Sequence, residues 1–190
     1  MSDRTLRILA IPGSLRRSSY NRSLLEAAAE LTPRGMSMSV YETLDTVPVF
    51  NEDLEQPSPP GVARLREAVA SSDGLLIATP EYNQSLPGVV KNMIDWLSRS
   101  QEGAGLEGKP VAVTGVTTGP WGTRLAQSML RQVLLSTRAL VLTQPTLFLR
   151  DAGEIFNEDR TLGDEETRER LRQLLVAFDG WIRSVAPAHR

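Results

Sequence analysis

The feature that most constrains the fold of this chain is a regular alternation between two kinds of apolar segment. One kind is short and apolar at nearly every position, which predicts strands buried on both faces. These strand-like runs are 6–11 (LRILAI), 74–79 (GLLIAT), 110–116 (PVAVTGV), 139–149 (interrupted by Pro145) and, more weakly, 36–42. Strands of this kind are typical of a parallel sheet that is covered on both sides.

The other kind of segment has apolar residues at helical spacing, so that each segment carries one apolar face. The four faces are Leu24, Leu25, Ala28 and Leu31; Val62, Leu65 and Val69, with Ala68; Leu125, Met129, Val133 and Leu134; and Leu171, Leu174, Leu175, Phe178, Ile182 and Val185. Two polar stretches, 45–61 and 150–166, follow neither pattern and are expected to be irregular.

The order of these segments predicts the fold class. Strands and helices that alternate five times indicate an α/β fold, with a parallel sheet between two layers of helices. Five strands favour the flavodoxin-like three-layer sandwich with strand order 2-1-3-4-5. We expect one domain covering residues 1–190. Such sheets bind ligands beyond the carboxyl ends of the strands at the switch point, which here are the loops after the first, third and fourth strands.

The residue types that are missing restrict the possible chemistry. The chain contains no cysteine, and its one histidine, His189, stands next to the C-terminus. Thiol catalysis, disulfides, iron–sulfur clusters, a Ser-His-Asp triad and a metal site with two histidines are therefore excluded. Carboxylates, hydroxyls, backbone dipoles or a bound cofactor remain, and we expect no metal.

Charge and hydropathy restrict the partners. The 21 basic and 23 acidic residues give a net charge of −2, so nothing favours nucleic acid or an anionic membrane surface. The N-terminal MSDRTLR lacks the apolar core of a signal peptide, and no apolar run reaches membrane-spanning length. We expect a soluble cytoplasmic protein with a small-molecule partner.

The stretch IPGSLRRSSYN (11–21) joins the first strand to the first helix. Its possible hydrogen-bond donors are Ser14, Arg16, Ser18, Ser19 and Asn21. The N–H groups at the start of the following helix add to them, and an arginine can grip a phosphate with two donors. Neither the Walker lysine nor the three-glycine dinucleotide motif is present. The sequence therefore predicts an anion site. The alternative is that Ser18 or Ser19 only caps the helix while the arginines face solvent.

The second loop is TPEYNQSLPG (79–88). Pro80 forces an extended entry, and Pro87 suits the first turn of a new helix. The stiff loop between them carries Glu81, an aromatic residue, two amides and exposed backbone N–H groups, a combination that suits a flat heteroaromatic ligand. The alternative is that Glu81 faces solvent and that Tyr82 covers the core.

The third loop is GVTTGPWGTR (115–124). Its three glycines let the backbone come close to a ligand. Trp121 can stack on a ring or pack over the core. Together the three loops offer phosphate donors at one end and planar stacking with backbone hydrogen bonds at the other, which is the shape of a flavin mononucleotide.

At this point the sequence resembles a known family, the NAD(P)H-dependent FMN reductases of the flavodoxin-like superfamily, which include quinone, chromate and azo-dye reductases. The matching stretches are GSLRRSSYNRSL (13–24), TPEYNQSLPGVVKNMIDWLSR (79–99) and LRQVL (130–134). The resemblance runs from the first strand through the helix after the fourth strand. The third loop departs from it, because relatives often have a glycine-rich loop without tryptophan.

The resemblance implies a set of FMN contacts. Phosphate contacts would fall on Ser14, Arg16, Ser19 and Asn21. Ring contacts would fall on Pro80, Glu81, Tyr82 and Asn83, mostly through the backbone, and the third loop would add Thr114, Gly115 or the region of Gly119. The family also implies a homodimer or homotetramer with the flavin near the interface, so the segments 91–99 and 130–140 are candidates for that interface.

The resemblance implies a two-step hydride transfer from NADPH or NADH through bound FMN to a quinone, a free flavin or a similar acceptor. The cofactor carries the chemistry, so we expect no essential side-chain acid or base. Two alternatives stay open, a one-electron carrier like flavodoxin and a noncatalytic nucleotide-binding module. The choice between NADPH and NADH also stays open, with Arg17 or Arg22 as possible partners of a 2′-phosphate.

Overall fold

A computed structural model of the chain describes residues 4–99 and 105–185; His189 lies outside them. The described residues form one parallel sheet with strand order β2-β1-β3-β4-β5, and β6 also pairs with β4. The strands are β1 (Leu6–Pro12), β2 (Met36–Val40), β3 (Gly74–Ala78), β4 (Pro110–Val116), β5 (Leu140–Val141) and β6 (Leu147–Leu149). The predicted α/β fold and strand order are confirmed.

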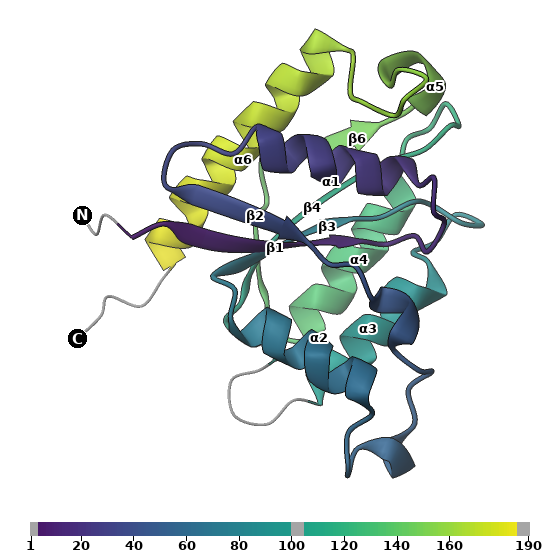
Figure 1. The fold of residues 1–190 in the computed structure, drawn as a ribbon, viewed down its shortest axis with the longest axis vertical. Coiled ribbons are helices and arrows are strands. Elements are labelled where there is room, and N and C mark those ends of the chain that lie inside the picture. The colour runs from purple at the N-terminus through teal and green to yellow at the C-terminus, as the bar shows by residue number, and fades with distance from the viewer. Residues whose placement is uncertain (1–3, 100–104, 186–190) are drawn as a thin grey trace.

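Helices cover both faces of the sheet (Figure 1). One layer holds α1 (Tyr20–Glu30) and α6 (Glu165–Val185), with the short α5 (Ala152–Ile155) beside them. The other layer holds α2 (Pro60–Ala70), α3 (Gly88–Ser98) and α4 (Arg124–Ser136). Successive strand residues point to opposite faces. In β1, Ile8 and Ala10 therefore belong to the core under α1 and α6, whereas Leu9 and Ile11 belong to the core over α2, α3 and α4.

The register places the carboxyl ends of three strands at one edge. Pro12 at the end of β1 pairs with Ala78 at the end of β3. Ala78 in turn pairs with Thr114, close to the end of β4. The loops that follow these strands must therefore leave the sheet side by side, as the fold rule for parallel sheets requires.

The last strand differs from the prediction. The run 139–149 was expected to form one strand, but it forms two, β5 opposite Pro110–Val111 and β6 opposite Thr114–Val116. Between them the chain leaves the sheet around Pro145, which has no N–H group for a strand ladder. The polar stretches also contain short helical turns, namely η1 (Leu44–Thr46), η2 (Glu52–Leu54) and α5.

The apolar face predicted for α4 is right for Val133 and Leu134, which pack against the core, but wrong for its first two residues. The side chains that pack inward are Ala126, Leu130 and Leu134, with Gln127 beside them. Leu125 and Met129, expected inside, are 48% and 40% exposed. Two apolar rows with the same four-residue spacing lie next to each other on this helix, and the sequence pattern alone cannot show which of them faces the sheet.

Candidate functional site

The three predicted loops meet at the carboxyl edge of β1, β3 and β4. Hydrogen bonds continue past the paired strands: Gly13 N donates to Ala78 O over 2.8 Å, and Thr79 N donates to Thr114 O over 2.9 Å. We name the segments that follow loop 1 (residues 13–19), loop 2 (79–87) and loop 3 (117–123). Together they form what we call the three-loop site.

Two glycines allow these strand ends to lie so close. A Cβ atom on Gly115 would collide with the carbonyl oxygen of Thr79, which is backbone and cannot move aside. A Cβ atom on Gly13 would lie 2.7 Å from a methyl carbon of Val90 in α3. In both cases the new Cβ atom would lie closer to its neighbour than van der Waals contact allows, so only glycine fits at these positions.

Loop 1 collects hydrogen-bonding groups at the start of α1. The Ser19 hydroxyl accepts from Arg22 N over 3.4 Å and caps the helix, so the expected serine cap is present. This leaves the hydroxyl hydrogen of Ser19 available as a donor. The first turn of α1 has no acidic residue, so the positive end of the helix dipole is not neutralised locally.

The arginines of this region differ in how they are engaged. Arg22 binds both oxygens of Glu42, at 2.7 and 2.8 Å, and is therefore committed to an ion pair. Arg16 and Arg17 are exposed, and within residues 4–99 and 105–185 neither forms an ion pair with a carboxylate. Both line a pocket of about 360 Å³ between loop 1 and the end of β2. The two unpaired guanidinium groups make loop 1 suited to an anion.

Loop 2 is a tight hairpin turn. Tyr82 and Ser85 exchange two backbone hydrogen bonds of 3.0 Å each, and the two residues between them, Asn83 and Gln84, have φ angles of 51° and 61°. Two successive left-handed residues define a type I′ turn, so the loop is stiff, as predicted. Left-handed backbone in non-glycine residues is costly and concentrates at functional sites. The turn holds Tyr82 outward, 46% exposed.

Loop 3 presents an exposed tryptophan. Trp121 is 81% exposed and does not cover the core, and Gly122, with φ at +70°, follows it. The other two loops also each expose one large apolar side chain, Leu15 at 54% and Tyr82 at 46%. Each of the three loops thus exposes one large apolar or aromatic side chain, while the unpaired guanidinium groups lie on loop 1.

Side chains also connect the loops to one another. The Asn21 amide of α1 donates to Val116 O over 2.9 Å and accepts from Val116 N over 3.0 Å. The hydroxyls of Ser14 and Tyr82 lie 3.2 Å apart, which joins loop 1 to loop 2. Glu81 Oε2 accepts from the backbone N–H groups of Leu125 and Ala126 at 2.9 and 3.0 Å, which joins loop 2 to α4. Side-chain hydrogen bonds therefore join α1 to β4, loop 1 to loop 2, and loop 2 to α4.

These contacts divide the predicted site residues into two groups. The first group lies on the loops themselves, with side-chain or backbone groups for a ligand: Ser14, Arg16, Ser19, Tyr82, Asn83 and Gly119. Residues that support the loops from within the protein are Asn21, Pro80, Glu81, Thr114 and Gly115. Thr114 is fully buried and its hydroxyl donates to Leu147 O over 3.2 Å, so that hydroxyl is not free for a ligand. The supporting contacts of Thr114, Glu81 and Asn21 join residues 33 to 95 positions apart, and no local sequence pattern signals them.

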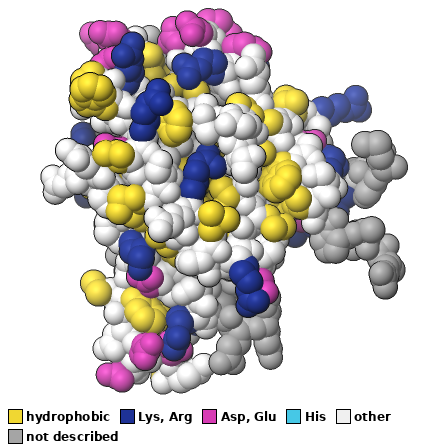
Figure 2. Space-filling model, turned by 180° about the vertical axis from the view of Figure 1, so that it is seen from behind, with side chains coloured by type: hydrophobic (Ala, Val, Ile, Leu, Met, Phe, Trp, Pro, Cys, Tyr) yellow, Lys and Arg dark blue, Asp and Glu magenta, His cyan; other side chains and the backbone are white. Residues whose placement is uncertain are grey.

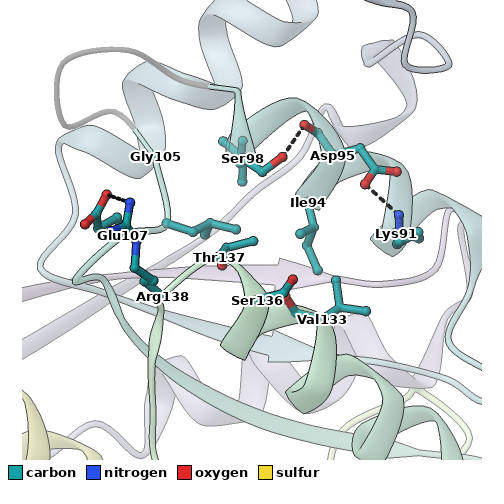
Figure 3. A pocket seen from close by; sticks show the side chains of 12 residues that line it. Lys91, Ile94, Asp95, Ser98, Gly105, Glu107, Val133, Ser136, Thr137 and Arg138 are labelled. Atoms are coloured by element: carbon teal, nitrogen blue, oxygen red, sulfur yellow. Dashed lines mark hydrogen bonds and ion pairs between the residues drawn. The ribbon is translucent and has the colours of Figure 1, made fainter.

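A second hollow lies between α3 and α4 (Figure 3), and none of its lining residues belongs to the three loops. It has a volume of about 410 Å³ and is lined by polar and charged side chains. Its charges are paired with each other, Lys91 with Asp95 at 2.6 Å and Arg138 with Glu107 at 2.9 Å. It offers no uncompensated charge for an ionic ligand.

Two partly buried cations stand outside the three-loop site. Burial lowers the pKa of the Lys109 ammonium, which donates to the carbonyl oxygens of Val69 and Ser72 behind the end of α2. Burial also lowers the pKa of the Arg131 guanidinium, which donates to Leu142 O over 2.6 Å. Both cations satisfy carbonyl groups where chain segments end, which is a structural role.

Two kinds of feature are absent from residues 4–99 and 105–185. No group of three or more histidine, cysteine, aspartate or glutamate side chains is placed to hold a metal ion. No helix in that part of the chain has the length and apolar character that crossing a membrane requires.

Comparison with known proteins gives the family of the chain. Residues 6–154, which contain all three loops, match the family model of the NADPH-dependent FMN reductases. The chain belongs to this family. It is also 41% identical to an NAD(P)H-dependent FMN reductase from Pseudomonas aeruginosa, over 96% of this chain and 98% of that protein.

Two further relatives agree with this assignment. A 2-hydroxy-1,4-benzoquinone reductase from a Burkholderia species is 34% identical, over 94% of this chain and 97% of its own length. The solved structure of FerB, a flavoenzyme NAD(P)H:(acceptor) oxidoreductase from Paracoccus denitrificans, superimposes with a TM-score of 0.86 at 32% identity, covering 94% of this chain and 98% of FerB. The predicted family, the flavodoxin-like fold and the class, an FMN-dependent NAD(P)H oxidoreductase, are confirmed.

Proposed function

We propose that the three-loop site binds FMN and that the protein uses it to pass hydride from NADPH or NADH to a small quinone. The observation that carries the proposal is the arrangement of the three loops. Unpaired arginines and a helix N-terminus lie on loop 1, and exposed aromatic residues lie on loops 2 and 3, all at the switch-point edge where such sheets bind nucleotides.

The residues fit FMN at both ends. Ser14, Arg16 and Ser19 supply donors for the phosphate, and the free N–H groups of α1 complete an anion site. Tyr82 and the backbone of the stiff turn at Asn83 face the region where the ring would be held. Gly115, which tolerates no side chain, lets loops 2 and 3 stay close to each other.

When bound, FMN would supply the redox chemistry, in which a hydride from NAD(P)H and one proton from water convert a quinone to a hydroquinone. The chain itself binds, orients and shields. We assign no acid or base role to a side chain, because the donors on loop 1 are suited to holding an anion and the carboxylate of Glu81 is committed to α4. We also propose a cytoplasmic location, because NAD(P)H is available there.

A quinone is the acceptor class that we favour over free flavin. Relatives of the chain from Burkholderia and Pseudomonas putida are named as quinone reductases, and each is covered over more than nine-tenths of its length. A small planar ring can stack beside Tyr82 or Trp121, which are both exposed.

We further propose that two copies associate through α4. Leu125 and Met129, four positions apart on this helix, form an apolar row that is 48% and 40% exposed. Figure 2 shows the molecule from behind, where hydrophobic side chains appear in several groups between basic and uncharged ones. An apolar row that is half exposed on a helix surface is typical of an interface. If the protein sediments as a monomer at micromolar concentration, the proposed association through α4 is wrong.

The test of the function is anaerobic reduction of the FMN-loaded protein by NADPH and by NADH, followed by reoxidation with 1,4-benzoquinone or free riboflavin. We expect rapid bleaching of the flavin absorbance and steady turnover with the quinone. A protein that binds FMN but consumes no NAD(P)H would instead be a one-electron carrier, and one that takes up no FMN would be a noncatalytic module.

A matched pair of variants tests the phosphate end. Arg16→Ala should weaken FMN binding by about tenfold or more, because a charge-assisted hydrogen bond is lost. Arg17→Ala should leave FMN affinity within about twofold, since we assign no phosphate contact to Arg17. Equal losses in both variants would show that only the general positive charge of loop 1 matters.

A further inference from the structure

Helix α4 is not capped by its own N-cap residue. Thr123, at that position, makes no side-chain hydrogen bond to the first turn. Its hydroxyl instead accepts from Gln127 Nε2 over 2.9 Å. The first turn of α4 contains no acidic residue either. Both usual local means of stabilising a helix start are therefore missing.

Glu81 supplies what α4 lacks, from a different part of the chain. One carboxylate oxygen, Oε2, accepts from Leu125 N at 2.9 Å and from Ala126 N at 3.0 Å. These are first-turn N–H groups of the helix, and the oxygen that accepts them carries negative charge. Such bonds are stronger than neutral ones, and the charge also complements the helix dipole.

The position of Glu81 gives this contact a meaning beyond helix stability. Glu81 stands directly before the hairpin turn of loop 2, whose first residue, Tyr82, faces the site. Helix α4 begins directly after loop 3. The contact thus ties together the two loops between which the ring of the cofactor would be held.

We propose that Glu81 is a positioning residue, whose carboxylate clamps loop 2 to the first turn of α4 and so fixes the separation of loops 2 and 3 for a planar ring. The side chain acts through α4 and makes no contact with the ring itself. This inference rests on the proposed function for the identity of the ligand, but the clamp is a property of the protein without any ligand.

The first experiment measures the clamp in ligand-free protein. Amide hydrogen exchange of Leu125 and Ala126 reports opening of the first turn of α4. Glu81→Ala should speed this exchange by about tenfold, and Glu81→Gln should restore much of the protection, because its amide oxygen still accepts. The control is Asp164→Asn, since Asp164 accepts from Thr167 N over 2.8 Å at the start of α6 in the same way. This control should leave the exchange of Leu125 and Ala126 unchanged.

The second experiment measures affinity for FMN and for lumiflavin, the ring without ribityl phosphate, by quenching of flavin fluorescence. Glu81→Ala should weaken both ligands by the same factor, about tenfold, Glu81→Gln should weaken both less, and Asp164→Asn should change neither beyond about twofold. Wild-type exchange rates in Glu81→Ala, or normal lumiflavin affinity in that variant, would overturn the inference. If the wild type binds neither flavin, the proposed function fails, and the exchange data alone then decide whether the clamp exists.

Discussion

Replacing Asn21 by alanine should be among the most damaging single changes near the site. Hydrogen bonding between β3 and β4 ends at Thr114. The N–H and C=O of Val116, two residues later, point to the same side of β4, where β3 no longer provides a partner. The Asn21 amide binds both groups and so takes the place of the missing strand. Asn21 is 3% exposed and Val116 is 1% exposed, so water has little access to either.

The magnitude follows from the two backbone groups that the alanine leaves unpaired. A buried donor or acceptor without a partner costs about 1–3 kcal/mol, so the free energy of unfolding should fall by about 2–6 kcal/mol. Urea unfolding of the ligand-free protein measures this value. Asn92 is a matched control, because its amide also accepts from one backbone N–H (Phe50, 2.7 Å) and donates to one carbonyl (Pro48, 2.9 Å). It is less buried and lies outside the three loops.

Flavin binding separates a supporting role of Asn21 from a direct one. If Asn21 acts by holding α1 against β4, Asn21→Ala should weaken FMN and riboflavin by equal factors, whereas Asn92→Ala should weaken neither. A loss confined to FMN would show that the amide donates to the phosphate itself. A fall of less than about 1 kcal/mol in the free energy of unfolding would refute the reasoning from unpaired backbone groups.

Three further predictions follow from single contacts. Gly115→Ala should lower the free energy of unfolding in urea by about 3 kcal/mol or more, because the new Cβ atom collides with backbone. At Gly119 the atom nearest to a new Cβ is 3.8 Å away, so Gly119→Ala should change this free energy by less than about 0.5 kcal/mol, and equal effects in the two variants would contradict the prediction. Trp121→Ala should leave the free energy of unfolding within about 0.5 kcal/mol, since the side chain is 81% exposed, and should raise the KM for NADPH or quinone with little change in kcat; an unchanged KM would remove Trp121 from the site. Hydrogen bonds from Thr167 hold the pKa of the Asp164 carboxyl below its ordinary value of 3.8. The stabilising effect of Asp164 is therefore complete above that ordinary value and is lost as the pH falls through the lowered pKa. Acid unfolding followed by circular dichroism should be less pH-dependent in Asp164→Asn, and an identical acid unfolding curve would contradict this.

The sequence was sufficient to predict the layers of the fold and the three loops. Strands buried on both faces leave an unbroken apolar run, and the loops are set by the carboxyl ends of neighbouring strands. It was not sufficient for the phase of α4, because Leu125 and Ala126 begin two apolar rows of equal spacing. The choice between these rows depends on which one fits the sheet.

The roles of individual site residues were harder to predict than their location. Glu81 and Asn21 carry the polar groups that a ligand site needs, and nothing local distinguishes a side chain that binds a ligand from one that binds distant backbone. Glu81 reaches α4 across 44 positions and Asn21 reaches β4 across 95 positions. Contacts over such distances exist only once the sheet has brought the segments together.

The division of the last strand also affects how copies of this protein can meet. A strand at the edge of a sheet has a row of unpaired N–H and C=O groups, to which a strand of another chain can bind, and this leads to aggregation. Here that side of β4 is covered by β5 and β6, which are two and three residues long, with the chain out of the sheet between them. An incoming strand would find no continuous ladder to extend. Growth of the sheet from chain to chain is therefore disfavoured at this edge.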